Sequence, residues 1–191
     1  VRPTVGHVHV GGADPRTLKG RALIEKVGLV PQQPADLLYG ETVAGECAAA
    51  DREAGAPDGT AAALLRRVAG EVNTELHPRD LSEGQRLALA LAVVLTAAPP
   101  LVLLDEPTRG LDYPAKARLV SALRELAAQG HAIVLATHDV ELAAELSGRT
   151  IVLADGEIVA DGPSRDVVLQ TPVFSPQVAK ILAPLPYLTV R

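Results

Sequence analysis

The sequence predicts an α/β fold built on a parallel sheet, and three observations carry this prediction. Aliphatic runs at 101–104 and 131–137 read as buried strands, and each is followed by a segment with the start signals of a helix. This alternation of strand and helix is typical of a parallel sheet that helices cover on both faces. Alternating residues on both sides of Asp155-Gly156 predict an antiparallel hairpin.

Composition limits the possible functions. The 191 residues are 48% hydrophobic but only 2% aromatic, which predicts one sizeable domain with a core of Ala, Val and Leu. A net charge of −5 without a run of basic residues argues against nucleic acid as a partner. The single Cys47 cannot form an internal disulfide, so we expect a reducing cytoplasmic setting and a structural thiol.

The first third of the chain contains two expected strands and a helical region. Residues 5–10 alternate as a strand does, and residues 26–32 read as a second short strand that ends in a loop at Gln32. Residues 35–80 are rich in Ala, Glu and Arg, which predicts two or three short helices joined by a loop around Pro57. A strand already under way at residue 5, in a chain without methionine, led us to expect a fragment.

Residues 81–98 predict a helix that is buried nearly all round. Ser82 and Gln85 have the spacing of a capping box, and the alanines favour a helix over a strand. The start of such a helix carries unpaired amides and a positive dipole end, which suits a phosphate. Residues 87–104 carry no charge, but Pro99 and Pro100 divide them, so we expect no direct membrane insertion.

The elements after residue 104 follow in order. Asp112 with Pro114 predicts a helix that ends near Gly130, and Asp139 predicts the start of another. Beyond the hairpin we expect a helix capped by Ser164, a second one from Ser175, and an extended tail over 184–191.

Polar side chains follow the two expected parallel strands at their carboxyl ends, where open sheets bind ligands. They are Asp105 with Glu106, and Thr137 with His138. Each pair taken alone would more often be an ordinary polar strand end before a helix cap. Two such ends together with a phosphate-competent helix start are harder to explain in that way.

The motifs LSEGQR, LVLLDEP and RGLD, followed by the pair Thr137-His138, resemble the signature, Walker B, D-loop and switch histidine of ATP-binding cassette (ABC) ATPases. VGLVPQ is similar to the family's Q-loop, with Gln32 in the glutamine position. The resemblance implies a P-loop NTPase with a RecA-like parallel sheet, a helical insertion and antiparallel strands. It places one ABC ATPase domain over 1–191, a helical subdomain over 35–84 and a C-terminal extension over 163–191.

The resemblance also implies roles at the hydrolytic site. Asp105 and Gln32 would hold Mg²⁺, while Glu106 would orient and polarise the attacking water. His138 would contact the γ-phosphate of ATP. Phosphoryl transfer of this kind depends mainly on positioning and on charge stabilisation.

Further roles are implied across a dimer. Ser82, Glu83, Gly84 and Gln85 would close on ATP that the opposite subunit holds, although family members commonly have glycine in place of Glu83. Asp112 would contact the partner through the D-loop, or cap its helix, or do both.

The family's phosphate-binding loop, G-x-x-x-x-G-K-[ST], does not occur in these 191 residues. The sequence resembles a cassette ATPase that is truncated at its N-terminus, without the first strands, the P-loop and the first helix. We expect the 191 residues alone to bind ATP weakly or not at all.

The short insertion, the RGLD motif and the segment 171–184 resemble the ATPases of energy-coupling factor importers, which take up vitamins or metal ions such as cobalt. Such a subunit would pair with a second ABC ATPase in a homo- or heterodimer. It would also bind a transmembrane coupling protein at the cytoplasmic face of the membrane. The alternatives are a soluble ABC ATPase outside transport, or a nonhydrolytic relic.

Overall fold

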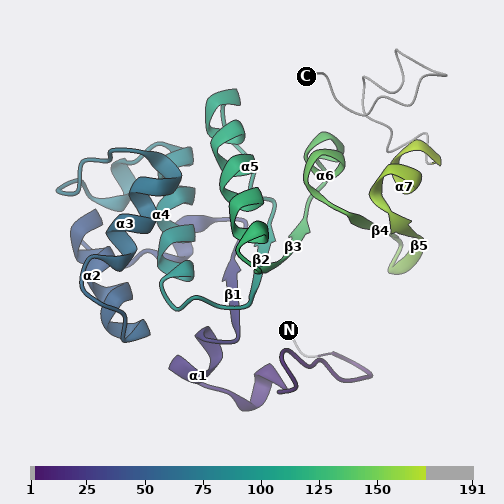
Figure 1. The fold of residues 1–191 in the computed structure, drawn as a ribbon, viewed down its shortest axis with the longest axis horizontal. Coiled ribbons are helices and arrows are strands. Elements are labelled where there is room, and N and C mark those ends of the chain that lie inside the picture. Colours follow the sequence, from purple (N-terminus) through teal and green to yellow (C-terminus); the bar gives the residue numbers. More distant parts are fainter. Residues whose placement is uncertain (1–2, 171–191) are drawn as a thin grey trace. The chain divides into compact units, whose positions relative to one another are not determined.

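The computed structural model describes residues 3–170 and divides the chain into two compact units, Val1–Ala136 and Thr137–Arg191 (Figure 1). The first unit contains a parallel sheet and a group of helices, and the second contains a hairpin with two helices. The two units are described separately.

Three parallel strands form the sheet of the first unit in the order β1-β2-β3. They are β1 (Val27–Val30), β2 (Leu101–Asp105) and β3 (Ala132–Ala136). In the register, Leu29 of β1 pairs with Leu103 of β2, which pairs with Val134 of β3. The predicted parallel pairing is therefore confirmed.

Within the described residues of the first unit, helices cover only one face of this sheet, so the predicted cover of both faces is not met there. Val30 and Leu104 on the covered face are 0% and 2% exposed, whereas Leu29 and Val134 on the other face are 52% and 55% exposed. The strand order explains the difference. Right-handed crossovers that advance in one direction along a sheet leave their helices on the same side.

The helices of the first unit follow the predicted order. A 3₁₀ turn at Pro15–Thr17 precedes the short helix α1 (Arg21–Ile24). After β1 the helical region contains α2 (Val43–Ala54) and α3 (Thr60–Ala69), with 3₁₀ turns before and after them at Pro34–Leu37 and Pro78–Asp80. Next come α4 (Glu83–Leu95) and, between β2 and β3, α5 (Tyr113–Ala128). Their order along the chain can be followed by colour in Figure 1.

The loop between α2 and α3 is tied to α2 by one buried carboxylate. Asp51, which is 2% exposed, accepts hydrogen bonds from the backbone amides of Gly59 (2.7 Å) and Ala61 (2.8 Å). These bonds satisfy two amides at the start of α3, where no helical partner is available. The two helices pack with α4 around a core formed by Val43, Cys47, Ala50, Ala61, Leu65, Leu81, Ala88, Leu89 and Ala92.

Helix α4 is buried nearly all round, as predicted. From Leu87 to Leu95 every residue is buried except Val93 and Val94. The helix ends at Leu95, the fully buried Pro99 follows, and β2 begins at Leu101. Among the described residues, no helix has both the length and the apolar character that crossing a membrane requires.

The predicted strand over residues 5–10 does not form. Val5 is 89% exposed and Val8 is 51% exposed, and Val10 makes only an isolated bridge with Ala13. Alternation alone does not make a strand, because a strand also needs a neighbour to pair with and a face to bury. In the described residues this segment has neither.

The second unit contains α6 (Val140–Leu146), the antiparallel pair β4 (Arg149–Ala154) and β5 (Glu157–Pro163), and α7 (Ser164–Gln170). The predicted hairpin is confirmed. Its turn residues Asp155 and Gly156 have φ of 50° and 81°, as a type I′ turn requires. The helix predicted from Ser175 and the extended tail over 184–191 lie outside the described residues.

Candidate functional site

The carboxylates Asp105 and Glu106 stand at the carboxyl end of the central strand β2. Asp105 is the last residue of the strand and pairs with Ala136 of β3. The backbone amide of Glu106 donates to the carbonyl of Ala136 at 2.8 Å, and the carbonyl of Glu106 accepts from the amide of Arg109 at 3.1 Å. Both acids therefore sit on backbone that the sheet and a tight turn hold in place.

Glu106 has an unusual backbone conformation. Its φ is 48°, in the left-handed region that residues other than Gly and Asn rarely adopt. A residue in such a conformation persists only where its surroundings hold it there, and such residues concentrate at functional sites. The backbone geometry marks Glu106 in a way that its neighbour Asp105 does not share.

A cavity of about 390 Å³ brings several of the predicted residues together within the first unit. Gln32 lines it from the loop after β1, Glu83 from the first turn of α4, and Glu106 from the end of β2. Arg86 and Arg109 add positive charge to the same wall. The cavity therefore combines carboxylates, an amide and guanidinium groups.

The start of α4 forms the capping box that the sequence predicts. The Ser82 hydroxyl accepts from the amide of Gln85 at 3.3 Å, and the Gln85 side chain accepts from the amide of Ser82 at 3.1 Å. These bonds use the acceptors of both side chains. The hydroxyl proton of Ser82 and the amide protons of Gln85 are still donors that could serve a ligand.

Gly84 is required by the packing of α4 against α5. A β-carbon at this position would lie 2.8 Å from the β-carbon of Ala115, closer than such atoms approach in real structures. Gly84 and Gln85 face a different, smaller hollow that Leu111 and Ala115 also line. Asp112 caps α5 by accepting from the amide of Ala115 at 2.8 Å, so the helix-cap role that the sequence allowed for Asp112 is present.

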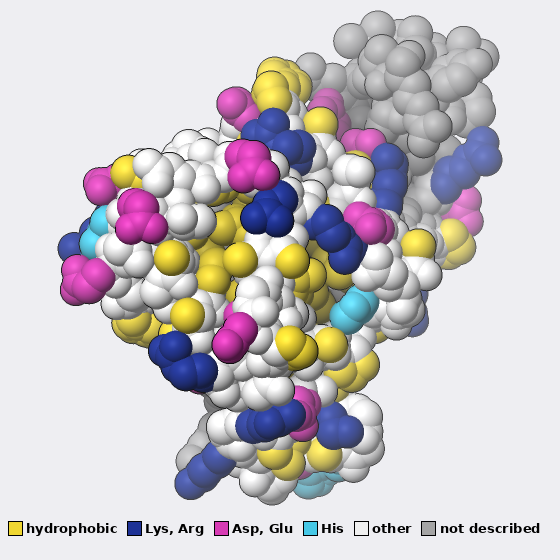
Figure 2. All heavy atoms as spheres, turned by 60° about the vertical axis from the view of Figure 1, so that its left-hand side comes forward, with side chains coloured by type: hydrophobic (Ala, Val, Ile, Leu, Met, Phe, Trp, Pro, Cys, Tyr) yellow, Lys and Arg dark blue, Asp and Glu magenta, His cyan; other side chains and the backbone are white. Residues whose placement is uncertain are grey.

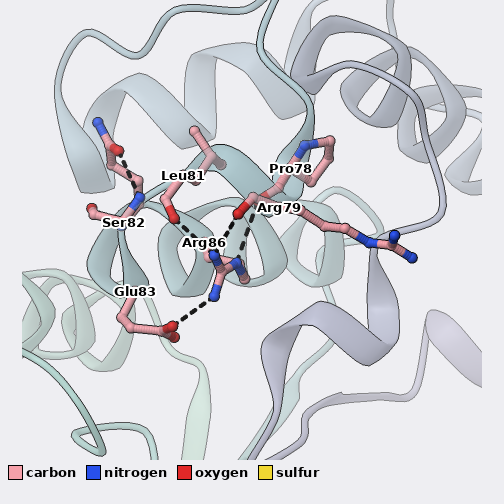
Figure 3. A network of polar contacts seen from close by, with 7 residues as sticks. Pro78, Arg79, Leu81, Ser82, Glu83 and Arg86 are labelled. Atoms are coloured by element: carbon pink, nitrogen blue, oxygen red, sulfur yellow. Dashed lines mark hydrogen bonds and ion pairs between the residues drawn. The ribbon is translucent and has the colours of Figure 1, made fainter.

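Sequence reasoning missed Arg86, which is the centre of the polar network at this helix start (Figure 3). Its guanidinium donates to the carboxylate of Glu83 and to the backbone carbonyls of Pro78, Arg79 and Leu81. The available signal was the spacing of three between Glu83 and Arg86, because opposite charges at that spacing meet on a helix surface.

A second missed residue, Glu46, fixes the chain after Gln32. Its carboxylate is 6% exposed and accepts from the amides of Tyr39 (2.9 Å) and Gly40 (2.5 Å). Helix α2 is thereby fastened to the segment that leaves the cavity wall. Nothing in the sequence distinguishes Glu46 from the other acids between residues 41 and 53.

His138 is the second residue of the second unit and is not among the residues that line the cavity. It lies in the short turn between β3 and α6. On either side of it, the Thr137 hydroxyl accepts from the amide of Asp139 at 3.0 Å, and Asp139 caps α6 by accepting from Leu142 at 2.9 Å. The turn that carries His138 is therefore locally well defined.

The donor set for Mg²⁺ is sparse. Within residues 3–170 no group of three or more His, Cys, Asp or Glu side chains could form a metal cage. Asp105 supplies one exposed carboxylate and Gln32 one exposed amide oxygen. This set suits Mg²⁺ only together with phosphate oxygens and water, which is how proteins usually bind this ion.

Two surface features complete the description. A larger hollow of about 560 Å³ lies along α2 and α3, where Cys47, Asp51 and Arg66 line it, and it includes none of the predicted site residues. On the face of the molecule drawn in Figure 2, Lys and Arg side chains are interspersed with Asp and Glu side chains and do not gather in one basic patch.

Comparison with known proteins connects this site to a family. A family model described as "AAA domain, putative AbiEii toxin, Type IV TA system" matches residues 24–144. The "Putative ABC transporter ATP-binding protein GSU1281" of Geobacter sulfurreducens is 36% identical over 172 residues, which cover 86% of this chain and 67% of the relative. The chain belongs to the family of ABC transporter ATP-binding proteins.

Other ABC proteins are more similar but much longer. The "Putative ABC transporter ATP-binding protein SCO2324" of Streptomyces coelicolor is 64% identical over 190 residues, which cover 100% of this chain and 34% of the relative. The chain thus spans about a third of the length of this relative.

Solved ABC structures share the fold. The ATP-binding cassette MJ0796, in a dimeric post-hydrolysis state bound to ADP and Pi, has a TM-score of 0.72 at 26% identity over 86% of this chain and 75% of that chain. CbiO1 from Clostridium perfringens, part of the ABC transporter complex cbiONQ, has a TM-score of 0.73 at 23% identity over 97% of this chain and 75% of that chain, a likeness of fold alone. The predicted P-loop NTPase fold of the ABC type is confirmed.

Proposed function

We propose that this chain is the ATP-hydrolysing part of an ABC importer and couples ATP hydrolysis to the uptake of a vitamin or a metal ion. The observation that carries the proposal is the cavity in the first unit, which both Gln32 and Glu106 line in a member of the ABC family. The relatives are described as transporter ATP-binding proteins, which favours transport over the alternatives.

Glu106 is the group that we assign to the attacking water. It lines the cavity, and its left-handed backbone aims it differently from the preceding Asp105. A carboxylate within reach of water can orient the water and accept its proton. His138, which follows β3 two residues after the strand ends, is proposed to contact the γ-phosphate of ATP.

Asp105 and Gln32 would hold Mg²⁺ together with phosphate oxygens. The ion supplies charge neutralisation for the transferring phosphoryl group when it is bound. Asp105 ends β2, whereas Glu106 follows the strand in a left-handed conformation, so the two carboxylates can take different tasks.

The start of α4 would act on ATP held by a second ABC ATPase subunit in a homo- or heterodimer. The capping box satisfies the amides of Ser82 and Gln85, so the helix end would act on the phosphate through the amides of Glu83 and Gly84 and through its dipole. Asp112 would add a contact across the same dimer while it caps α5. In this proposal residues 35–84 form the helical subdomain and residues 163–191 the C-terminal extension.

A transmembrane coupling protein completes the proposed assembly, at the cytoplasmic face of the membrane. The short helical region and the RGLD motif support the energy-coupling factor class of importer. The proposed dock is the loop around Gln32, which borders both the cavity and the helical region.

The test replaces Glu106 with glutamine in the complete product of the gene that encodes this chain. Glu106→Gln removes the proton acceptor but keeps the shape of the side chain, so we expect phosphate release to fall about 10²- to 10⁴-fold while ATP binding is retained. Steady-state phosphate release and equilibrium ATP binding measure the two effects. Unchanged turnover in Glu106→Gln would refute the assignment.

Glu53→Gln is the matched control, because Glu53 is an exposed carboxylate on α2, outside the cavity. Its turnover should equal that of the wild type. The same assay distinguishes the proposed ATPase from the second candidate, a nonhydrolytic relic. The relic is favoured by the absence of the G-x-x-x-x-G-K-[ST] motif from the 191 residues. A relic would release no phosphate in any variant.

A further inference from the structure

The first turn of α4 contains an ion pair between Glu83 and Arg86, and the proposed function does not assign a role to this pair. Nη1 of Arg86 donates to Oε1 of Glu83 at 2.7 Å. The Arg86 side chain is 16% exposed and that of Glu83 is 54% exposed, so the guanidinium is the more enclosed partner. Both residues line the cavity that contains Glu106.

Arg86 is fixed by backbone as well as by Glu83. Its Nη2 donates to the carbonyls of Arg79 (2.9 Å) and Leu81 (2.8 Å), and its Nε donates to the carbonyl of Pro78 (3.3 Å). Figure 3 shows the guanidinium between these carbonyls and the Glu83 carboxylate. The loop before α4 therefore holds the positive charge in one place, and Glu83 meets it there.

Glu83 is also held from its other side. A β-carbon at Gly110 would lie 3.5 Å from Cγ of Glu83, so the stem of Glu83 packs against the turn that follows β2. Gly110 has φ of 74°, which glycine adopts without strain. The stem and the carboxylate of Glu83 are thus both positioned, by Gly110 and Arg86 respectively.

The pair matters for an anion that approaches the helix start. The capping box uses the amides of Ser82 and Gln85, but those of Glu83 and Gly84 and the helix dipole still make this end positive. A carboxylate in the first turn would oppose a phosphate there. Charge repulsion of this kind is strong where water is excluded. An arginine that is held against the carboxylate neutralises the pair and leaves the amides to act on the phosphate.

We propose that Arg86 is a positioning residue that compensates the charge of Glu83, so that the start of α4 can accept the phosphates of ATP. The inference rests on the proposed function, because it concerns ATP at the same helix start. It accounts for an acid in the first turn of a helix whose start is proposed to bind phosphate.

The test is a double-mutant cycle in the complete gene product, with phosphate release measured as a function of ATP concentration. In Arg86→Gln the Glu83 carboxylate loses its partner, and we expect KM for ATP to rise about tenfold with a smaller change in kcat. Adding Glu83→Gln removes the exposed charge, so KM of the double variant should return to within about threefold of the wild type. Glu83→Gln alone completes the cycle.

Thermal unfolding separates this role from a purely structural one. Arg86→Gln also loses bonds to three carbonyls, so its Tm should fall, and the double variant should not recover that loss. Arg86→Lys keeps a positive charge but not the fork of donors, so we expect a lower Tm with KM near that of the wild type. This variant serves if Arg86→Gln does not fold.

Arg79→Gln is the matched control, since it removes a positive charge from the same loop. Only the Arg79 carbonyl takes part in the network, and its side chain points away from Arg86 (Figure 3). A KM that stays raised in the double variant, or an unchanged KM in Arg86→Gln, would overturn the inference alone. A wild type that does not turn over ATP would overturn the proposed function and the inference with it.

Discussion

At the scale of single residues, the fold lowers the reactivity of the Cys47 thiol by burying it. Burial raises the pKa of its thiol, and with the smaller effect of the nearby carboxylates of Asp51 and Glu46 the pKa reaches about 11. At pH 8 roughly one thiol in a thousand would be ionised, and only the thiolate reacts. We predict negligible labelling by iodoacetamide in the folded protein and rapid labelling in denaturant, which mass spectrometry can follow. Equal rates in both states would contradict the burial of Cys47.

A second prediction at this scale concerns Asp161 in the hairpin. Arg149 donates two hydrogen bonds to its carboxylate, at 2.8 and 2.7 Å, and thereby lowers the pKa of Asp161. A lowered pKa means that the pair favours the fold above the ordinary pKa of aspartate, near 4, and that this contribution is lost as the pH falls through the lower folded value. An NMR titration should place Asp161 below the ordinary range. Arg149→Gln should return it there, and an unchanged titration would refute the pair.

Residues of the site differ in how far the sequence could predict them. The resemblance places Gln32 and Glu106 at one ATP site and Glu83 against the ATP of the opposite subunit. In the structure all three line one cavity of the first unit, a proximity that the motifs do not predict. The left-handed backbone of Glu106 depends on bonds to residues distant in sequence, so no local pattern reveals it. The role of Arg86 could not be predicted either, because it depends on the direction in which the backbone carbonyls of the loop before α4 point.

At the scale of elements, the contact between β1 and α4 depends on the absence of a side chain. A β-carbon at Gly28 would lie 2.3 Å from Cγ1 of Val94 and 3.1 Å from Cγ of Pro99. Gly28→Ala should therefore force the helix from the strand and cost about 1–3 kcal/mol of unfolding free energy. Urea denaturation followed by far-UV circular dichroism measures this cost.

Val94→Ala provides the matching test of that packing, because it removes the atom with which the new methyl would collide. The double variant Gly28→Ala with Val94→Ala should be more stable than Gly28→Ala alone. Costs that simply add would show that the two residues do not compete for the same space.

Elements whose signals are local were predicted well. The capping box of Ser82 and Gln85 begins α4, and Asp155-Gly156 forms the hairpin turn, because each depends on residues that are close in sequence. The strand expected over residues 5–10 failed because a strand depends on a partner elsewhere. In the structure Val5 and Val8 find none within residues 3–170.

At the scale of the whole molecule, the distribution of the core could not be read from the strands themselves. Residues of β1 and β2 are aliphatic on both faces, which is the pattern of a strand that is buried on both sides. The strand order decides otherwise in the first unit, because both crossovers advance in one direction. Leu104 is consequently 2% exposed, while Leu29 on the opposite face is 52% exposed.

Two leucine-to-alanine changes test that asymmetry, since they remove the same atoms from opposite faces of one sheet. Leu104→Ala leaves a cavity in packed surroundings and should cost about 2–5 kcal/mol of unfolding free energy. Leu29→Ala removes a side chain that water already reaches, so its cost should be about 1 kcal/mol or less. Urea denaturation of the 191-residue chain, followed by far-UV circular dichroism because tryptophan is absent, gives both values. Equal costs would mean that both faces of the sheet are covered in solution.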